Sequence, residues 1–192
     1  MMTFASHDVD FASLTFHPGV IDPMFRQPYS DRALPLRPRL LGRSPLEIAT
    51  VDYDLGAPRV AYVDRVDADY HVATGKSEQW NDGRTYRNDG VDIAREGDGT
   101  PYVRAFEAGE WMQYTVTAEA PGPRSGWLLV AAAARATIAL TLNDSPAVTV
   151  VVSSGLRWRR IAVPLLPFAC GTNRLKIAVV NGNVRLKSIL IE

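Results

Sequence analysis

From Leu46 to the C-terminus the sequence is built of short apolar runs with a period near two, separated by Gly, Asn, Asp and Pro. In Arg174–Val179, for example, Leu175, Ile177 and Val179 fall on one face of an extended chain, the pattern of a half-buried antiparallel strand. Many short strands without a long helix predict an all-β fold, an antiparallel β-sandwich or jelly roll. The strands expected are Leu46–Thr50, Arg59–Val63, Tyr102–Phe106, Trp111–Ala118, Gly126–Ala133, Thr137–Leu142, Ala147–Val152, Trp158–Val163, Arg174–Val180 and Val184–Ile191.

Turn chemistry lies between several of these runs. Asn143–Pro146 and Val180–Asn183 carry the Asn, Asp and Gly residues that tight turns favour, so both predict hairpins. Val130–Ala136 has helical propensity, but its apolar flanks favour a strand with small residues where sheets approach closely.

Residues 1–45 differ from the rest, because they hold six of the 13 prolines. Proline removes a backbone donor and fixes φ, so this segment predicts neither a long helix nor a central strand. We expect 1–45 to be an extended proline-rich arm or linker and 46–192 to be the sandwich. The aromatic residues of the arm favour packing on a neighbouring surface, although a partly disordered tail accounts for the segment equally well.

The charge balance excludes several classes of protein. The 192 residues carry 21 basic and 21 acidic side chains, which argues against nucleic-acid binding. No apolar run of about 18 residues is present, so no membrane span is expected, and the first residues lack the features of a signal peptide. The single cysteine, Cys170, has no disulfide partner and is expected to be a small buried hydrophobe.

Sequence signals for catalysis are absent. There is no Gly-x-Ser-x-Gly elbow, P-loop, His-Glu-x-x-His motif or zinc-binding cysteine pair. Acidic groups such as Glu107 and Glu110, or Asp64, Asp67 and Asp69, do not by themselves define a glycosidase cleft or a calcium loop. We therefore expect a protein that is not an enzyme; a small hydrolase is the least favoured interpretation.

The loop from Asp64 to Asp92 is too long for a plain turn, and loops of this length are usually functional or disordered. Its segment 80–92 combines Trp, Tyr, Asn, Asp and Arg with glycines. Sugar sites pair aromatic platforms with such hydrogen-bonding groups. The alternative is that Trp80 and Tyr86 anchor the loop to the sandwich.

Four segments resemble carbohydrate-binding modules of family 6 and the related family 35. They are Val51–Gly56 with Val60–Asp64, the tyrosine-bearing Thr85–Ile93, Phe106–Val116, and Trp158–Leu165. The resemblance covers about Leu46–Glu192, and Gly109-Glu110-Trp111 is its most specific part. It implies a non-catalytic jelly roll appended to polysaccharide-degrading enzymes, binding glycans at loops or on a concave face. It also implies an extracellular or periplasmic, secreted protein.

The departures from this family concern its calcium site and its sugar cleft. Where members commonly carry Glu-Ala-Glu, this chain has Ala49-Thr50-Val51, and Arg185 and Lys187 stand in place of an Asn-x-Asp arrangement. Hard cations need oxygen ligands and Lys187 would repel one, so the family calcium site is expected to be lost and no cofactor is expected. Ser153–Leu156 lacks the stacking tryptophan that the family often carries there.

The leading interpretation is an accessory carbohydrate-binding module of a glycoside hydrolase, with a poly- or oligosaccharide as partner. The expected ligand contacts are Tyr86, Trp80, Asn88 and Asp82, acting by stacking and hydrogen bonds. The alternative is a structural or interaction sandwich that has lost sugar binding and docks on a catalytic domain. Trp111 and Trp127, and with them Trp158, are assigned to core packing, and Tyr102 and Tyr114 to strands.

Overall fold

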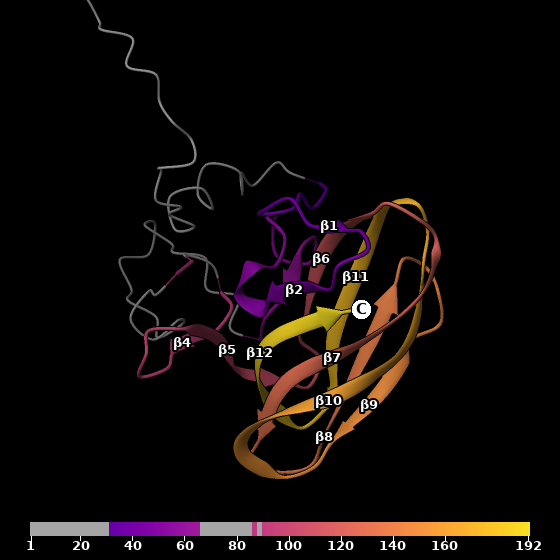
Figure 1. The fold of residues 1–192 in the computed structure, drawn as a ribbon. Coiled ribbons are helices and arrows are strands. Elements are labelled where there is room, and N and C mark those ends of the chain that lie inside the picture. Colours follow the sequence, from indigo (N-terminus) through magenta and orange to yellow (C-terminus); the bar gives the residue numbers. More distant parts are fainter. Residues whose placement is uncertain (1–30, 66–85, 88–89) are drawn as a thin grey trace, which may run out of the picture.

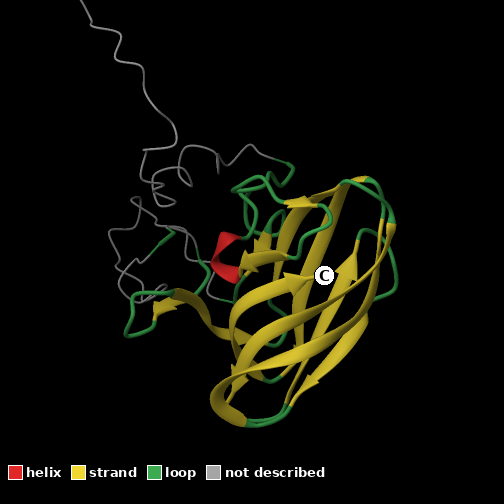
Figure 2. Ribbon diagram, in the orientation of Figure 1, coloured by secondary structure: helices red, strands yellow, loops and turns green. Residues whose placement is uncertain are grey.

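The structure is a computed structural model that describes residues 31–65, 86–87 and 90–192. The described chain forms two six-stranded sheets, and Figure 2 shows strands over most of it. The elements in chain order are β1 (Leu40–Leu41), β2 (Leu46–Ala49), a 3-10 turn η2 (Thr50–Asp52), β3 (Tyr62–Val63), β4 (Ile93–Arg95), β5 (Pro101–Glu107), β6 (Trp111–Ala118), β7 (Gly122–Ala132), β8 (Ala136–Leu142), β9 (Val148–Val152), β10 (Gly155–Phe168), β11 (Gly171–Asn181) and β12 (Asn183–Ile191).

The strands are divided between two layers. Sheet I has the order β1-β6-β11-β8-β9, with β3 also paired to β6; sheet II has the order β10-β7-β12-β5-β4, with β2 also paired to β12. Figure 1 shows β12, β7 and β10 of sheet II in front of β11 and β8 of sheet I. The predicted all-β sandwich is confirmed.

The core lies between the two sheets. In β6 the alternating side chains of Met112, Tyr114 and Val116 are fully buried, and in β11 those of Leu175 and Ile177 are too. Each large apolar side chain buried in this way contributes about 1.5–3 kcal/mol to the hydrophobic driving force. The period-two pattern therefore fixes which face of each strand points into the core. The side chains of the opposite face lie on the outer surface of the sandwich.

One of the two predicted hairpins is confirmed and the other is wrong. β8 and β9 pair antiparallel on either side of Asn143–Pro146, and Asn143 adopts a φ of 53°. At Asn181-Gly182 the chain instead crosses from β11 in sheet I to β12 in sheet II. Gly182 has a φ of 85°, and a Cβ there would lie 2.8 Å from the Cβ of Ala136. The turn residues predict a reversal of direction, but they do not specify which strand becomes the neighbour.

The end of the described N-terminal segment pairs with β6 along the edge opposite to β11. Leu34 forms a β-bridge with Leu55, and β1 pairs in parallel with the end of β6. Residues 1–30 lie outside the described residues, and the division of the chain at residue 45 stays a prediction. Within the described part, no helix is long and apolar enough to cross a membrane.

Several side chains assigned to the core lie on the surface instead. Trp127 is 36% exposed on the outer face of sheet II, Trp111 is half-buried on the outer face of sheet I, and Trp158 is half-buried. The prediction that these tryptophans pack in the core is wrong, since their strand neighbours Met112 and Leu128 take the inward positions. Cys170 is exposed rather than buried, because the chain turns between β10 and β11 there. Tyr114 and Tyr102 lie in strands as expected.

Candidate functional site

Tyr86 is the one predicted ligand contact among the described residues. Its hydroxyl donates to Asp52 Oδ1 and accepts a hydrogen bond of 3.1 Å from Arg37 Nη2, and Arg37 Nε lies 3.3 Å from Asp52 Oδ2. Burial and the adjacent Asp52 carboxylate raise the pKa of the Tyr86 hydroxyl. The ring is partly buried against the core. The hydroxyl is therefore occupied within the protein, and stacking on the ring is the contribution left to Tyr86.

The other three predicted contacts, Trp80, Asp82 and Asn88, lie outside the described residues. Whether they gather around Tyr86 stays a prediction.

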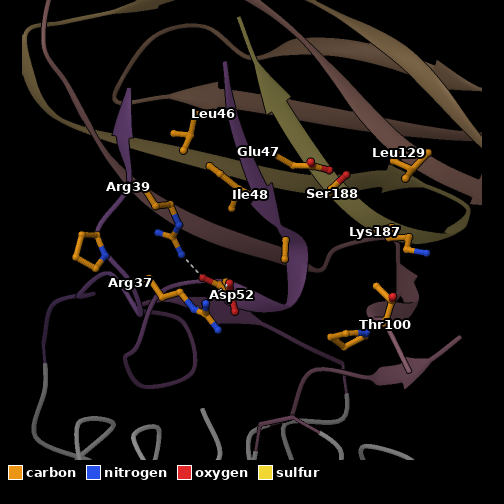
Figure 3. Close-up of a pocket in the computed structure, with 13 residues that line it drawn as sticks. Arg37, Arg39, Leu46, Glu47, Ile48, Asp52, Thr100, Leu129, Lys187 and Ser188 are labelled. Atoms are coloured by element: carbon orange, nitrogen blue, oxygen red, sulfur yellow. Dashed lines mark hydrogen bonds and ion pairs between the residues drawn. The ribbon is translucent and has the colours of Figure 1, made fainter. Parts of the chain in front are cut away.

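A groove of about 430 Å³ is lined by Asp52, the residue that accepts the Tyr86 hydrogen bond (Figure 3). Arg37 and Asp52 line it on one side, and Lys187, Ser188 and Leu129 line it on the other. Arg37 and Asp52 form an ion pair with each other, while apolar atoms from β2 and β7 form much of the rest. The groove thus combines an apolar surface with a few polar groups, as ligand sites commonly do.

The positions of the family calcium site are part of the same region. Thr50 Oγ1 donates to the carbonyl oxygens of Leu186 at 2.6 Å and Lys187 at 3.1 Å, and the Tyr114 hydroxyl donates to Thr50 O at 2.9 Å. Ala49 and Val51 offer no side-chain oxygen. Nothing in the described chain gathers three or more His, Cys, Asp or Glu side chains as metal ligands. This donor set does not fit a calcium ion, which requires six to eight oxygen ligands.

Trp158 lies over the cations that replace the family's Asn-x-Asp arrangement. Arg185 Cζ and Lys187 Nζ are 5.2 and 5.6 Å from its ring centroid, and Trp158 Nε1 donates to Glu96 Oε1 at 2.5 Å. The ring of Tyr102 meets it edge-on at 5.3 Å. The indole is thereby held in one orientation on the outer face of sheet II.

A second candidate surface is the outer face of sheet I, where a shallow hollow of about 630 Å³ crosses β6, β11 and β8. The lining residues that carry polar side chains are Gln113, Thr141, Asn143, Asp144, Ser145, Arg174 and Lys176. Next to it, Lys176 Nζ lies 3.8 Å from the ring centroid of Trp111. Burial lowers the pKa of the Lys176 ammonium group. We call this surface the sheet I hollow.

Local hydrogen bonds orient two of these side chains. Gln113 Nε2 donates to Asp54 Oδ2 at 3.2 Å, and Asn143 Oδ1 accepts from the backbone N–H of Arg174 at 2.8 Å. Strand pairing places Lys176 opposite Gln113 on one side and opposite Thr141 on the other. The hollow is therefore built on paired strands, which hold its polar groups in fixed positions.

Sequence reasoning missed this hollow. The alternation of β6 does place Trp111 and Gln113 together on the face opposite Met112, so part of the signal was present. The order β6-β11-β8, which brings Thr141 beside Lys176, is a property of the sheet and not of the chain order.

The acidic pair Glu107 and Glu110 has a structural role. The buried Glu110 carboxylate accepts the backbone N–H groups of Glu107 at 2.7 Å and Arg65 at 2.9 Å. Burial raises the pKa of Glu110. Glu107 pairs with the Arg65 guanidinium at 3.0 Å on the surface.

Comparison with known proteins places the fold in a class. No protein-family model matches the sequence, and no curated protein matches it. Among solved structures, the module CsCBM6-3 from Clostridium stercorarium, in complex with cellobiose, superposes with a TM-score of 0.56 at 15% identity, over 81% of this chain and 97% of that one.

Two enzymes give weaker superpositions. The Podospora anserina GH26-CBM35 β-(1,4)-mannanase matches at 22% identity over 53% of this chain and 23% of its own, with a TM-score of 0.45. The exo-β-1,3-galactanase of Phanerochaete chrysosporium matches at 18% identity over 53% of this chain and 26% of its own, with a TM-score of 0.46. The chain thus spans about a quarter of the length of these enzymes.

The class that this architecture defines is a β-sandwich module. More particularly, the fold is that of the family 6 module CsCBM6-3, which confirms the family 6 fold that the sequence resemblance implied.

Proposed function

We propose that this chain is a non-catalytic carbohydrate-binding module, an accessory to a glycan-degrading enzyme outside the cytoplasm. It would hold a poly- or oligosaccharide by hydrogen bonds and aromatic contact without breaking a bond. The observation that carries the proposal is the sheet I hollow, in which amide, hydroxyl and cationic side chains converge beside Trp111.

The chemistry of the hollow suits a sugar. Saccharides present many hydroxyl groups, and Gln113 of β6, Thr141 of β8 and Asn143 of the turn after β8 supply donors and acceptors. Because paired strands hold these groups in place, little conformational entropy is lost when a ligand binds. A shallow open surface of this kind accommodates part of a long chain whose ends extend into solvent.

We keep the loop that carries Tyr86, called the loop end, as a second proposed contact region. Tyr86 would be the stacking platform, and Trp80, Asn88 and Asp82 would be the further ligand contacts. The ring of Tyr86 would supply about 1 kcal/mol of stacking. Calcium is proposed to be dispensable, because Thr50 already satisfies carbonyl oxygens at the family site.

The test is a titration of xylan, cellulose, mannan and agarose oligomers followed by tryptophan fluorescence and calorimetry. Binding that is weakened by Thr141→Val and unchanged by Tyr86→Ala would locate the ligand in the sheet I hollow, and the reverse would locate it at the loop end. Thr149→Val on β9 is the matched control, since Thr149 is an exposed threonine of the same sheet that does not line the hollow. Silence across the panel, extended to acidic glycans, would exclude the proposed function.

One observation favours the alternative function, an interaction domain. The exposed Trp127 lies directly between Ala162 of β10 and Leu190 of β12, so sheet II presents an apolar strip to solvent. Exposed apolar strips are typical of docking surfaces. This function predicts that no glycan of the panel binds and that Trp127→Arg abolishes association with a co-expressed catalytic domain. The carbohydrate proposal predicts that glycans bind and that Trp127→Arg leaves this binding intact.

A further inference from the structure

Three side chains from separate parts of the chain meet at the Tyr86 hydroxyl. The hydroxyl donates to Oδ1 of Asp52 in η2 and accepts a hydrogen bond of 3.1 Å from Arg37 Nη2. Arg37 Nε lies 3.3 Å from Asp52 Oδ2, so the guanidinium contacts both the phenol and the carboxylate. Each of the three side chains thus contacts the other two. Charge-assisted contacts that close on one another in this way fix the direction of the Tyr86 ring.

The backbone of Tyr86 is held in an unusual conformation as well. Its φ is 76°, in the left-handed region that bulky residues seldom adopt. The next residue, Arg87, is fully buried, with its guanidinium carbon 3.6 Å from the ring centroid of Tyr53, and its Nη1 donates to Tyr53 O. Conformations of this kind cluster at ligand contacts and active sites, where the surrounding structure enforces them. The fold therefore constrains the Tyr86 side chain at its base as well as at its hydroxyl.

Arg37 belongs to a segment that is attached to the sandwich on both sides of it. Leu34 exchanges backbone hydrogen bonds of 2.9 and 2.7 Å with Leu55, and the side chain of Leu36 is buried. Two residues after Arg37, Arg39 forms its buried salt bridge with Asp54. The place of Arg37 in the fold is therefore set by its neighbours in the chain and does not depend on its own side-chain contacts.

The Arg37–Asp52 ion pair is not needed to hold the fold together. The Arg37 side chain is 44% exposed, and exposed ion pairs change the free energy of unfolding only slightly. Its consequence is the orientation of Tyr86, because a ring that is already ordered loses little conformational entropy when a ligand stacks on it. Arg37 and Asp52 also line the groove together (Figure 3), so these contacts lie at a surface that a ligand can reach.

We propose that Arg37 is a positioning residue of the loop end, which holds Asp52 and the Tyr86 hydroxyl so that the Tyr86 ring meets a ligand in one orientation. This inference rests on the proposed function, and in particular on Tyr86 as a ligand contact. It makes a residue of the predicted N-terminal arm a working part of the binding module.

The first measurement is made without a ligand. In the full chain with ¹³C-labelled tyrosine, the ring signals of Tyr86 are assigned by their loss in Tyr86→Phe. We expect these signals to shift and broaden in Arg37→Gln, because the phenol keeps only its bond to Asp52. Arg43→Gln is the matched control, since it removes the same charge from an exposed arginine between β1 and β2. Unchanged Tyr86 signals in Arg37→Gln, or equal changes in the control, would overturn the inference.

The second measurement is the affinity for the glycan of the panel that the wild-type protein binds most tightly. Arg37→Gln should weaken binding by about threefold to fivefold, close to the loss in Tyr86→Ala, with a melting temperature near that of the wild-type protein. In Tyr86→Phe, which lacks the hydroxyl, adding Arg37→Gln should cause little further loss, because the two residues act as one unit. An equal fold-loss in both backgrounds would show that Arg37 does not act through Tyr86 and would overturn the inference.

Two further outcomes separate this inference from the proposed function. Glycan binding that is insensitive to both Tyr86→Ala and Arg37→Gln would overturn the inference, while the proposed function would stand at the sheet I hollow. The absence of binding to every glycan of the panel would refute the proposed function and the inference with it.

Discussion

Arg39 and Asp54 form a salt bridge of 3.0 Å in which the side chains are only 5% and 0% exposed. Arg39 also donates to the carbonyl oxygens of Thr115 at 3.0 Å and of Asp52, and the Asp54 carboxylate accepts from the Thr115 N–H at 2.9 Å. The pair thus fastens the segment before β1 and the segment after η2 to the edge of β6. Gln113 of the sheet I hollow also donates a hydrogen bond to Asp54, so the buried pair helps to orient a side chain of the proposed site.

Removing one member of this pair should be costly. Asp54→Ala leaves a buried guanidinium without its counter-ion, and we expect a loss of about 3–5 kcal/mol in the free energy of unfolding. Glu107→Gln breaks the exposed pair with Arg65 and should change stability by less than about 1 kcal/mol. Urea unfolding of both variants measures the difference; similar losses for the two would contradict the structural role of the buried pair.

Stability should not depend on calcium. A chelator is expected to leave the melting temperature unmoved, whereas Thr50→Val should cost about 1–3 kcal/mol because the carbonyl oxygens of Leu186 and Lys187 lose a donor. Thr149→Val, at an exposed site, is the matched control and should be nearly neutral. A clear fall on chelation that calcium restores would show that the ion is needed after all.

Gly126 is required by packing between strands of sheet II. A Cβ there would lie 2.2 Å from the carbonyl oxygen of Leu190, whereas a Cβ at Gly97 meets nothing within 4 Å. Gly126→Ala is therefore expected to destabilise the fold by about 1–3 kcal/mol, and Gly97→Ala to leave it nearly unchanged. Thermal unfolding compares the two; tolerance of alanine at Gly126 would mean that β7 and β12 are less closely paired than described.

Glu110 should give stability a defined pH dependence. Burial raises its pKa in the folded state above the ordinary value of a glutamate, so the folded protein holds this proton more tightly than the unfolded chain does. The contribution of this group to stability is therefore highest below about pH 4.5 and declines as pH rises through the raised folded pKa. The difference in unfolding free energy between the wild-type protein and Glu110→Gln, followed from pH 4 to 7, isolates it; a difference that is constant with pH would contradict the shift.

The fold could be predicted because the alternation of apolar and polar residues within each strand indicates which of its faces points inward. Met112, Tyr114 and Val116 alternate with outward residues, and so do Leu175, Ile177 and Val179, so local pattern alone indicates a half-buried sheet.

Which strands lie next to each other in a sheet could not be predicted from these local patterns. Asn181-Gly182 has the chemistry of a hairpin turn, yet β11 and β12 belong to different sheets because each finds its partners elsewhere in the chain. Trp111 is apolar and lies in a strand, so composition suggested the core; its place beside Lys176 follows from sheet order. The Tyr86–Asp52 hydrogen bond likewise joins residues that no local pattern connects.

The central claim is that a saccharide occupies the sheet I hollow, and a two-dimensional ¹H–¹⁵N NMR titration with the oligosaccharides of the panel tests it most directly. The account predicts shifts in the Trp111 indole N–H and in the side-chain amides of Gln113 and Asn143, which saturate together and are absent in Lys176→Gln. A spectrum in which these signals stay still while the ligand binds elsewhere, or in which no acidic or neutral glycan moves any signal, would contradict it.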